Sequence, residues 1–238
     1  MRFLPKISNT TFFCFSPPVM LITLVLEFIF ALYVLFTSIW RRSSVVIIAL
    51  LVCLSIFQLA EFQVCTGDHT VAWMRLGYVA IILLPALGIH LVSLITNHKW
   101  VRNLAYLFSF GLIGAFLLDT QSIQSTFCGG NYVLINTTGF AAQTYFPLYY
   151  SIALIVTALD ISWFIITKAN QSKRGREERT ILLLLLGGLA TFVVPTGAVY
   201  LLSPSARHGV PSIMCGFAVF LAITLTLFVY PRFKKLDI

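Results

Sequence analysis

The chain has 238 residues, of which 59% are apolar and only 10% are charged, and its mean hydropathy is +0.94. These values lie outside the range of soluble globular domains and indicate an integral membrane protein. The formal net charge of +8 gathers at the ends of the apolar stretches. This argues against nucleic acid as a partner and favours membrane lipids with anionic headgroups.

Seven apolar stretches follow one another along the chain, and each has about the 20 residues that a helix needs to cross a hydrocarbon core. Because backbone groups in lipid must find partners within their own segment, we expect helices and not open strands. The predicted spans run approximately over residues 18–40, 45–64, 71–96, 101–118, 145–167, 180–202 and 211–230. The sequence therefore predicts an all-α integral membrane fold, a single seven-helix bundle that occupies residues 1–238.

Two boundary segments need an interpretation. The first span begins at Pro17-Pro18 and lacks a small-residue cleavage site, so we interpret it as a retained helix and not as a signal peptide. The segment from Lys168 to Thr180 is polar, basic and contains a glycine, so we interpret it as a solvated connector between the fifth and sixth spans.

The basic residues predict the orientation of the bundle. On one side lie Arg41, Arg42, Lys99, Arg102, Lys168, Lys173, Arg174, Arg176, Arg179, Arg232, Lys234 and Lys235. The opposite side holds Arg2, Lys6, Arg75 and Arg207. The positive-inside rule then predicts an N-terminus outside and a C-terminus in the cytoplasm. We expect a multi-pass protein of the plasma (inner) membrane.

Two cysteines fall on the predicted outer side of the bundle. Cys65 ends the second span, and Cys128 lies in the loop between the fourth and fifth spans. Because the outer side is oxidising, the sequence predicts a disulfide between them. Two unlinked thiols are the alternative, and Cys14 is a competing partner.

Polar residues on the second span recur at helical spacing. An ionisable group inside a span costs roughly 2.5–3.5 kcal/mol, so each one needs a reason. Ser55, Gln58, Glu61 and Cys65 align on one helix face, which should point into the bundle. Glu61 lies about a turn from the outer surface. We expect an outward-facing ligand pocket formed by Glu61, Gln58, Trp73, Gln143 and Tyr149; a solvated helix-end acid without a ligand is the alternative.

A second set of polar residues lies deeper. His90 and Asp160 are at similar depth near the inner surface and are a candidate pair, and with Glu27 they form a candidate proton relay; packing through hydrogen bonds is the alternative. Pro85 and Pro195 should kink the third and sixth spans and are candidate hinges, with plain packing geometry as the alternative.

The obvious seven-helix classes do not fit. A retinal protein needs a lysine in its last span, and the seventh span has none. The sequence patterns typical of class A G-protein-coupled receptors are absent after the third span and in the seventh. An intramembrane zinc hydrolase needs converging histidines, and only His90 lies inside a span. We therefore expect no metal and no cofactor.

One family resemblance remains. The third span, 73-WMRLGYVAIILLPALGIHLVSLIT-96, resembles the third helix of the seven-helix sensor region at the N-terminus of many bacterial histidine kinases and diguanylate cyclases. The resemblance extends to residues 46–62, to residues 174–202 with their central proline, and to the ending 228-FVYPRFKKLDI-238. It implies a sensor whose seventh helix leads into a cytoplasmic signalling domain. The sequence ends at Ile238, where such a domain would begin, so we expect signalling through a separate partner.

These observations predict a receptor-like or sensor-like membrane protein. It would bind a small molecule, lipid or peptide in the outward-facing pocket and signal to a separate signalling or membrane-protein partner. A proton-coupled transporter or channel and a structural subunit of a membrane complex are alternatives from other classes. An intramembrane hydrolase is a weaker alternative, since the sequence favours a protein without enzymatic activity.

Overall fold

The computed structural model describes residues 17–38, 41–67, 71–119, 123–128, 133–137, 139–167, 173–202 and 210–237. Within these residues, seven helical segments are long and apolar enough to cross a membrane, which confirms the predicted all-α membrane bundle. The helices are α1 (Pro17–Thr37), α2 (Arg42–Thr66), α3 (Val71–Thr96), α4 (Lys99–Leu118), α5 (Phe146–Thr167), α6 (Lys173–Leu202) and α7 (Val210–Ile223). The chain also forms strands β1 (Ile123–Cys128) and β2 (Val133–Thr137), the π-helical segments η2 (Ala141–Tyr145) and η4 (Thr224–Val229), and the short helix α8 (Tyr230–Leu236).

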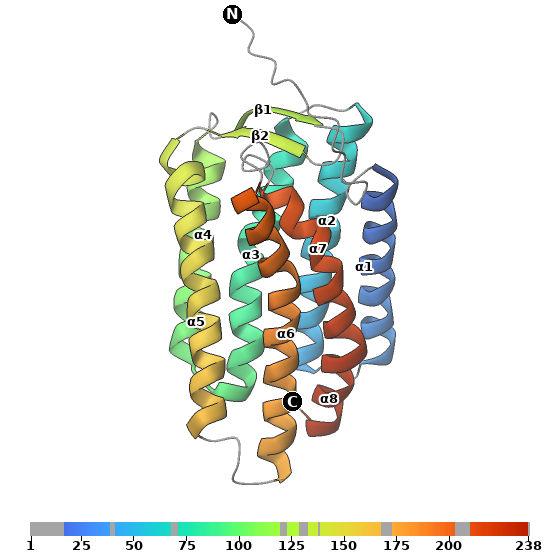
Figure 1. Ribbon diagram of the computed structural model, residues 1–238, viewed down its shortest axis with the longest axis vertical. Helices are drawn as coiled ribbons and strands as arrows, with labels where there is room; N and C mark the ends of the chain where they lie inside the picture. Colours follow the sequence, from blue (N-terminus) through green and yellow to red (C-terminus); the bar gives the residue numbers. More distant parts are fainter. Residues whose placement is uncertain are drawn as a thin grey trace, which may run out of the picture.

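Helices α2 and α3 form the centre of the bundle. In their membrane-spanning windows 61% and 67% of the residues are buried, against 22% in the spans of α4 and α5. Helix α2 packs between α1 and α3, and α3 also contacts α4 and α5. Helix α7 packs on α6, α2 and α1, so the last helix returns to the first (Figure 1).

The outer surface of the bundle is apolar along its length. Large side chains such as Phe36, Leu118, Trp163, Ile166 and Leu202 are strongly exposed. A soluble protein rarely exposes so much contiguous apolar area, whereas a lipid-facing surface requires it. The protein is therefore a multi-pass integral membrane protein.

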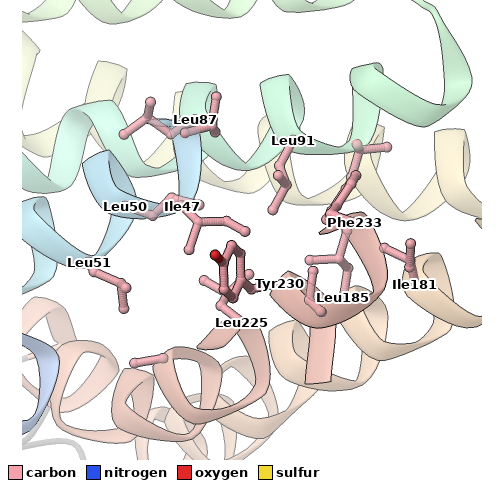
Figure 2. Close-up of a cluster of buried hydrophobic side chains, with 14 of the residues drawn as sticks. Ile47, Leu50, Leu51, Leu87, Leu91, Ile181, Leu185, Leu225, Tyr230 and Phe233 are labelled. Atoms are coloured by element: carbon pink, nitrogen blue, oxygen red, sulfur yellow. The ribbon is translucent and has the colours of Figure 1, made fainter. Parts of the chain in front are cut away.

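Two large apolar cores are stacked along the bundle. One lies near the C-terminus, where Ile47, Leu91, Ile181, Leu225 and Phe233 meet around Tyr230 (Figure 2). The other lies near the opposite end and contains Phe57, Met74, Tyr78 and Phe116 together with residues of the strands. We call these two ends of the bundle the C-terminal end and the hairpin end.

A β-hairpin lies across the hairpin end (Figure 1). Strands β1 and β2 pair antiparallel, and Ile123 and Val133 are buried against the core beneath them. The Cys65 and Cys128 sulfur atoms are 2.12 Å apart, which confirms the predicted disulfide and fixes the hairpin to the end of α2. The hairpin is an element that the sequence interpretation did not contain.

Two spans are longer than predicted. Helix α6 begins at Lys173, so the second half of the predicted connector is helical. Arg174 Nε donates to Glu178 Oε1 at 3.0 Å, one helical turn away, which stabilises this first part of the helix. The helical structure of the seventh span continues through η4 and α8 to Leu236. Pro231 does not interrupt it, because it lies in the first turn of α8, where a proline is tolerated.

Candidate functional site

The polar face of α2 points into the bundle, as predicted. Ser55, Gln58 and Glu61 are all buried, and only 1% of Glu61 is exposed. Glu61 is therefore not a solvated helix-end acid. The backbone N–H of Val133 in β2 donates to Ser212 Oγ at 3.2 Å, so the hairpin is bonded to the start of α7 directly above this site.

A small cavity lies at Glu61, and we call it the Glu61 cavity. Its volume is about 10 Å³, which is room for about one water-sized particle. It is lined by Val19, Met20, Thr23, Gln58, Glu61, Ser212 and Gly216, and so by α1, α2 and α7. The space at Glu61 among the described residues is thus small, and the outward-facing ligand pocket stays a prediction.

Glu27 lies next to this cavity on α1, one helical turn beyond Thr23 on the same buried face. It is fully buried, and its charge lies within Coulombic range of Glu61. Both Glu27 oxygens and Glu61 Oε1 have no hydrogen-bond partner among the described residues. The sequence analysis assigned Glu61 to the ligand pocket and Glu27 to the proton relay. A sequence indicates how deep a residue lies in the membrane, but not which helix faces pack together.

The other three residues of the expected pocket lie elsewhere. Trp73 is half-buried and packs against the core at the hairpin end, and Gln143 is exposed in η2. Tyr149 is buried between α3, α4 and α5, away from the Glu61 cavity. The structure therefore brings together Glu61 and Gln58 from the predicted set, and adds Thr23 and Ser212.

Tyr149 supports the proline of α3. Its hydroxyl lies 2.6 Å from Ser109 Oγ, and both side chains reach the carbonyl oxygen of Ile82, at 3.2 Å and 3.3 Å. Because Pro85 has no N–H, it disturbs the hydrogen bonding of the preceding helical turn. Hydroxyl groups of neighbouring helices commonly satisfy backbone groups at such positions in membranes. The predicted hinge at Pro85 is thus held from α4 and α5.

A second, larger cavity lies beside Pro85, and we call it the Pro85 cavity. Its volume is about 70 Å³, and its lining comes from α2, α3, α5, α6, α7 and the first residues of η4. The lining includes Leu54, Pro85, Gly88, Phe192, Met214 and Leu225. Its few polar groups come from side chains such as Tyr150 and Thr157. The sequence did not predict this cavity, because apolar residues that line a cavity look the same in a sequence as residues of a packed core. The pattern that could have indicated it is Pro85 followed by Gly88 one helical turn later.

The predicted pair of His90 and Asp160 is not formed. His90 Nδ1 lies 2.9 Å from Tyr106 Oη of α4, whereas Asp160 accepts a hydrogen bond from Thr96 and pairs with His98 Nδ1. The reason is the turn between α3 and α4, where Asn97 adopts a left-handed φ of 62° and brings His98 back toward α5. The proposed relay of Glu27, His90 and Asp160 has no connected path among these contacts.

Pro195, the second predicted hinge residue, lies within α6, and the helix continues past it to Leu202. Pro195 does not line either cavity. Phe192, one turn earlier, does reach the Pro85 cavity. A hinge function of Pro195 stays a prediction.

At the C-terminal end, α8 is bonded to the end of α1. Tyr230 Oη lies 3.0 Å from Thr37 Oγ1, and Lys234 Nζ donates to the Thr37 carbonyl at 3.3 Å. Arg41 bonds to the Lys234 carbonyl and pairs with Asp237 at 2.7 Å. These contacts, which we call the C-terminal clamp, fix the last residues of the described chain to the junction of α1 and α2.

Within the described residues, no group of three or more His, Cys, Asp and Glu side chains is arranged to hold a metal ion. The buried polar groups are instead spread over all seven spans. The seven spans and their lipid-facing surface define a multi-pass membrane bundle, and its described residues form the Glu61 cavity and the Pro85 cavity.

Comparison with known families gives the class of this bundle. Residues 19–236 match the family described as the N-terminal 7TM region of histidine kinase, which confirms the resemblance seen in the third, sixth and seventh spans. The chain belongs to this family. It is a seven-helix sensor region, which implies signal sensing and transmission to a kinase output. Neither a curated protein nor a solved structure gives a significant match.

Proposed function

We propose that this sensor region binds a small apolar or amphiphilic molecule from the membrane in the Pro85 cavity and transmits its presence through α7 to a kinase partner. The observation that carries the proposal is the position of the cavity. It touches the proline of α3 and also Cys215, Ala218 and Leu225 on the seventh span. Occupation of the cavity therefore acts directly on the helix that leads to the C-terminus.

The lining supports this class of ligand. It is almost wholly aliphatic and aromatic, with the Tyr150 hydroxyl and the Thr157 hydroxyl as polar groups. Sites for small molecules typically combine an apolar wall with a few placed polar groups. A molecule with an apolar body and one hydrogen-bonding group, such as a fatty acid or a short-chain alcohol, matches this composition.

The size of the cavity supports a conformational response. An engineered cavity of about 150 Å³ holds one benzene molecule, and the Pro85 cavity has about 70 Å³. A ligand of this kind binds only if the surrounding helices move apart. Such a ligand prefers the expanded state, and differential affinity of this kind is what shifts a population between two states.

The output follows α7, η4 and α8 to the C-terminal clamp. Leu225 lines the cavity and belongs to η4, and Tyr230 follows at the start of α8. π-helical segments are rare and are frequent at functional sites. Displacement of Leu225 therefore acts on the bonds that Tyr230 and Lys234 make with Thr37.

For the orientation, we propose that the hairpin end lies outside and the C-terminal end lies in the cytoplasm. Two features support this. The basic residues gather at the C-terminal end, as the positive-inside rule requires. The disulfide between Cys65 and Cys128 lies at the hairpin end, and disulfides persist on the oxidising side of a membrane.

The binding site can be tested with a photoactivatable fatty acid in nanodiscs that contain the full chain. The proposal expects saturable labelling of peptides from residues 85–92 and 214–225, and competition by unmodified fatty acid. Gly88→Leu should abolish this labelling, because a side chain at Gly88 projects into open space within the cavity.

The matched control is Gly197→Leu, since Gly197 is an exposed helical glycine whose added side chain also meets open space. This variant should keep the labelling of the wild type. Labelling that does not saturate, or that Gly88→Leu leaves unchanged, would show that the probe marks only the lipid-facing surface.

A further inference from the structure

We propose that Arg42, Lys99 and Arg102 form a binding site for the phosphate headgroup of an anionic phospholipid at the C-terminal end of the bundle. We call these three residues the basic surface. They lie at the starts of α2 and α4, and both of these helices pack on α3. The site is separate from both cavities, since none of the three residues lines either of them. It does not depend on the ligand proposed for the Pro85 cavity.

The first argument is that the basic surface has no counter-charge within the described chain. The acids toward this end of the bundle are each paired with another residue: Asp160 with His98, Glu177 with Arg232, Glu178 with Arg174, and Asp237 with Arg41. Among the described residues, neither Arg42 nor Lys99 makes an ion pair. Arg102 donates to the neutral Oδ1 of Asn103, at 3.1 Å and 3.2 Å. The positive charges of the basic surface are thus left for an anion from outside the chain.

The second argument is that the two arginines act on the same place. The charges of Arg42 and Arg102 both reach His90 of α3. The charge of Arg102 also reaches Tyr106, one turn further along α4, whose hydroxyl lies 2.9 Å from His90 Nδ1. Lys99, Arg102 and Tyr106 are spaced by three and four residues, which places them on one side of α4. Guanidinium groups bind phosphate oxygens through paired hydrogen bonds, so this region suits a phosphate group.

The surroundings favour a lipid over a soluble anion. Next to the basic surface, α4 exposes Trp100, of which 67% is accessible, followed at helical spacing by the exposed Leu104 and Leu107. On α2, the exposed Val45 follows Arg42 by one turn. A molecule whose phosphate binds the basic surface can therefore lay its acyl chains on the apolar surface beside it. Tryptophan is typical of the membrane–water interface, and basic residues there attract anionic lipids.

A bound headgroup would hold the part of α3 that follows Pro85. His90 lies between one and two helical turns after this proline. A phosphate group bound by Arg42 of α2 and Arg102 of α4 would bridge two helices at this segment. The lipid composition of the membrane would thereby influence the helix whose proline lines the Pro85 cavity.

The test uses a phosphatidylglycerol with a photoactivatable group in its acyl chain, added to the full chain in nanodiscs of phosphatidylcholine. We expect labelling of residues 45–52 and 100–108 that saturates as the labelled lipid is increased. Unlabelled phosphatidylglycerol should compete, and phosphatidylcholine should not. Inorganic phosphate in millimolar excess should not compete either, because it has no acyl chains to contact the apolar surface.

The variants Arg42→Gln and Arg102→Gln each remove one charge from the basic surface. Each should raise the amount of phosphatidylglycerol needed for half-maximal labelling by about fivefold, the factor expected for one basic residue at an anionic lipid surface. The matched control is Arg176→Gln, because Arg176 is an exposed residue of α6 at the same end of the bundle. This variant removes the same charge away from the basic surface and should label as the wild type does.

Three results would overturn the proposal. Labelling of the wild type that does not saturate, or that phosphatidylcholine prevents equally well, would show only ordinary lipid contact. Competition by inorganic phosphate as strong as that by phosphatidylglycerol would assign the basic surface to a soluble anion. An equal effect of Arg176→Gln would show an influence of total surface charge and not a site. The fatty-acid experiment at the Pro85 cavity labels other peptides, so the failure of one proposal is distinguishable from the failure of the other.

Discussion

The hydroxyl groups of Tyr149 and Ser109 lie 2.6 Å apart and meet at the carbonyl oxygen of Ile82, three residues before Pro85. Three helices are thus joined at the point where α3 is weakest. The bonds use side chains from α4 and α5, neither of which belongs to the central pair of helices. This arrangement makes the geometry of the proline dependent on the two most lipid-exposed spans.

Tyr149→Phe tests this support. The variant removes the hydroxyl and leaves Ser109 Oγ as the only side-chain donor to Ile82. We expect the free energy of unfolding to fall by about 1 kcal/mol, the net value of a typical buried hydrogen bond. Thermal unfolding in detergent measures the change. Tyr145→Phe is the control, because its hydroxyl bonds to the Phe108 carbonyl at an exposed position; an equal loss in both variants would contradict a special role of Tyr149.

Alanine substitutions at the adjacent glycines Gly187 and Gly188 should change the stability of the bundle differently. A Cβ atom on Gly188 would lie 2.9 Å from Leu221 Cδ1 and 3.3 Å from Thr224 Cγ2, whereas a Cβ on Gly187 meets nothing within 4 Å. Gly188→Ala should therefore push α6 away from α7 and destabilise the bundle by about 1–3 kcal/mol. Gly187→Ala should be neutral or should stabilise it by up to about 1 kcal/mol through helix propensity. Melting temperatures of the two variants decide; destabilisation by both would contradict the close packing at Gly188.

Removal of the disulfide should loosen the hairpin. The bridge closes a loop of 63 residues in sequence, for which the chain-entropy model gives about 4 kcal/mol. We expect less, about 2–3 kcal/mol, because the helices between the cysteines stay constrained by the membrane after tertiary contacts are lost. The Cys65→Ser/Cys128→Ser variant should melt at a lower temperature than the wild type. Reduction of the wild type should reproduce the shift, and reduction of the variant should have no effect.

The orientation can be tested by labelling intact cells. In a chain without other cysteines, a cysteine at Asp119 of the hairpin end should react with a membrane-impermeant maleimide. A cysteine at Asp237 should react only after the membrane is permeabilised, because the positive-inside rule places that end in the cytoplasm. The reverse pattern would contradict the orientation while leaving the fold unchanged.

The C-terminal clamp should depend on Arg41. Arg41→Gln removes the ion pair with Asp237 and the bond to the Lys234 carbonyl. Because exposed ion pairs contribute only about 0–1 kcal/mol, global stability should hardly change. The local effect should be larger: a spin label at Lys235 should gain mobility in Arg41→Gln and not in Arg42→Gln. Unchanged mobility in Arg41→Gln would show that the contacts of Tyr230 and Lys234 with Thr37 hold α8 without Arg41.

The sequence was informative where lipid imposes simple rules. Hydropathy predicted all seven spans, because each must satisfy its backbone within an apolar stretch of fixed length. The pairing of Cys65 with Cys128 followed from their placement on one side of the membrane. The inward face of Ser55, Gln58 and Glu61 followed from helical periodicity.

The sequence was less informative about which helix faces meet. His90 and Asp160 lie at similar depth in the membrane. The turn at Asn97 nevertheless places His98 against Asp160, and His90 lies within hydrogen-bond distance of Tyr106 instead. That Glu27 of α1 and Glu61 of α2 both face the interior depends on the rotation of α1 against α2, which spacing along one helix cannot provide. The hairpin was missed because strands of six and five residues carry a weak pattern, and because their pairing depends on the core beneath them.

The π-helical segment η4 has a mechanical consequence for α8. A π-helix holds one residue more in each hydrogen-bonded turn than an α-helix does, and one α-helical residue corresponds to a rotation of about 100°. Return of Thr224–Val229 to α-helical bonding would therefore turn α8 about its own axis by about 100° relative to α7. Tyr230 and Lys234 would leave Thr37, and a different side of the last helix would face the proposed kinase partner. A shift of one residue in the hydrogen-bond register of η4 would thus rotate α8.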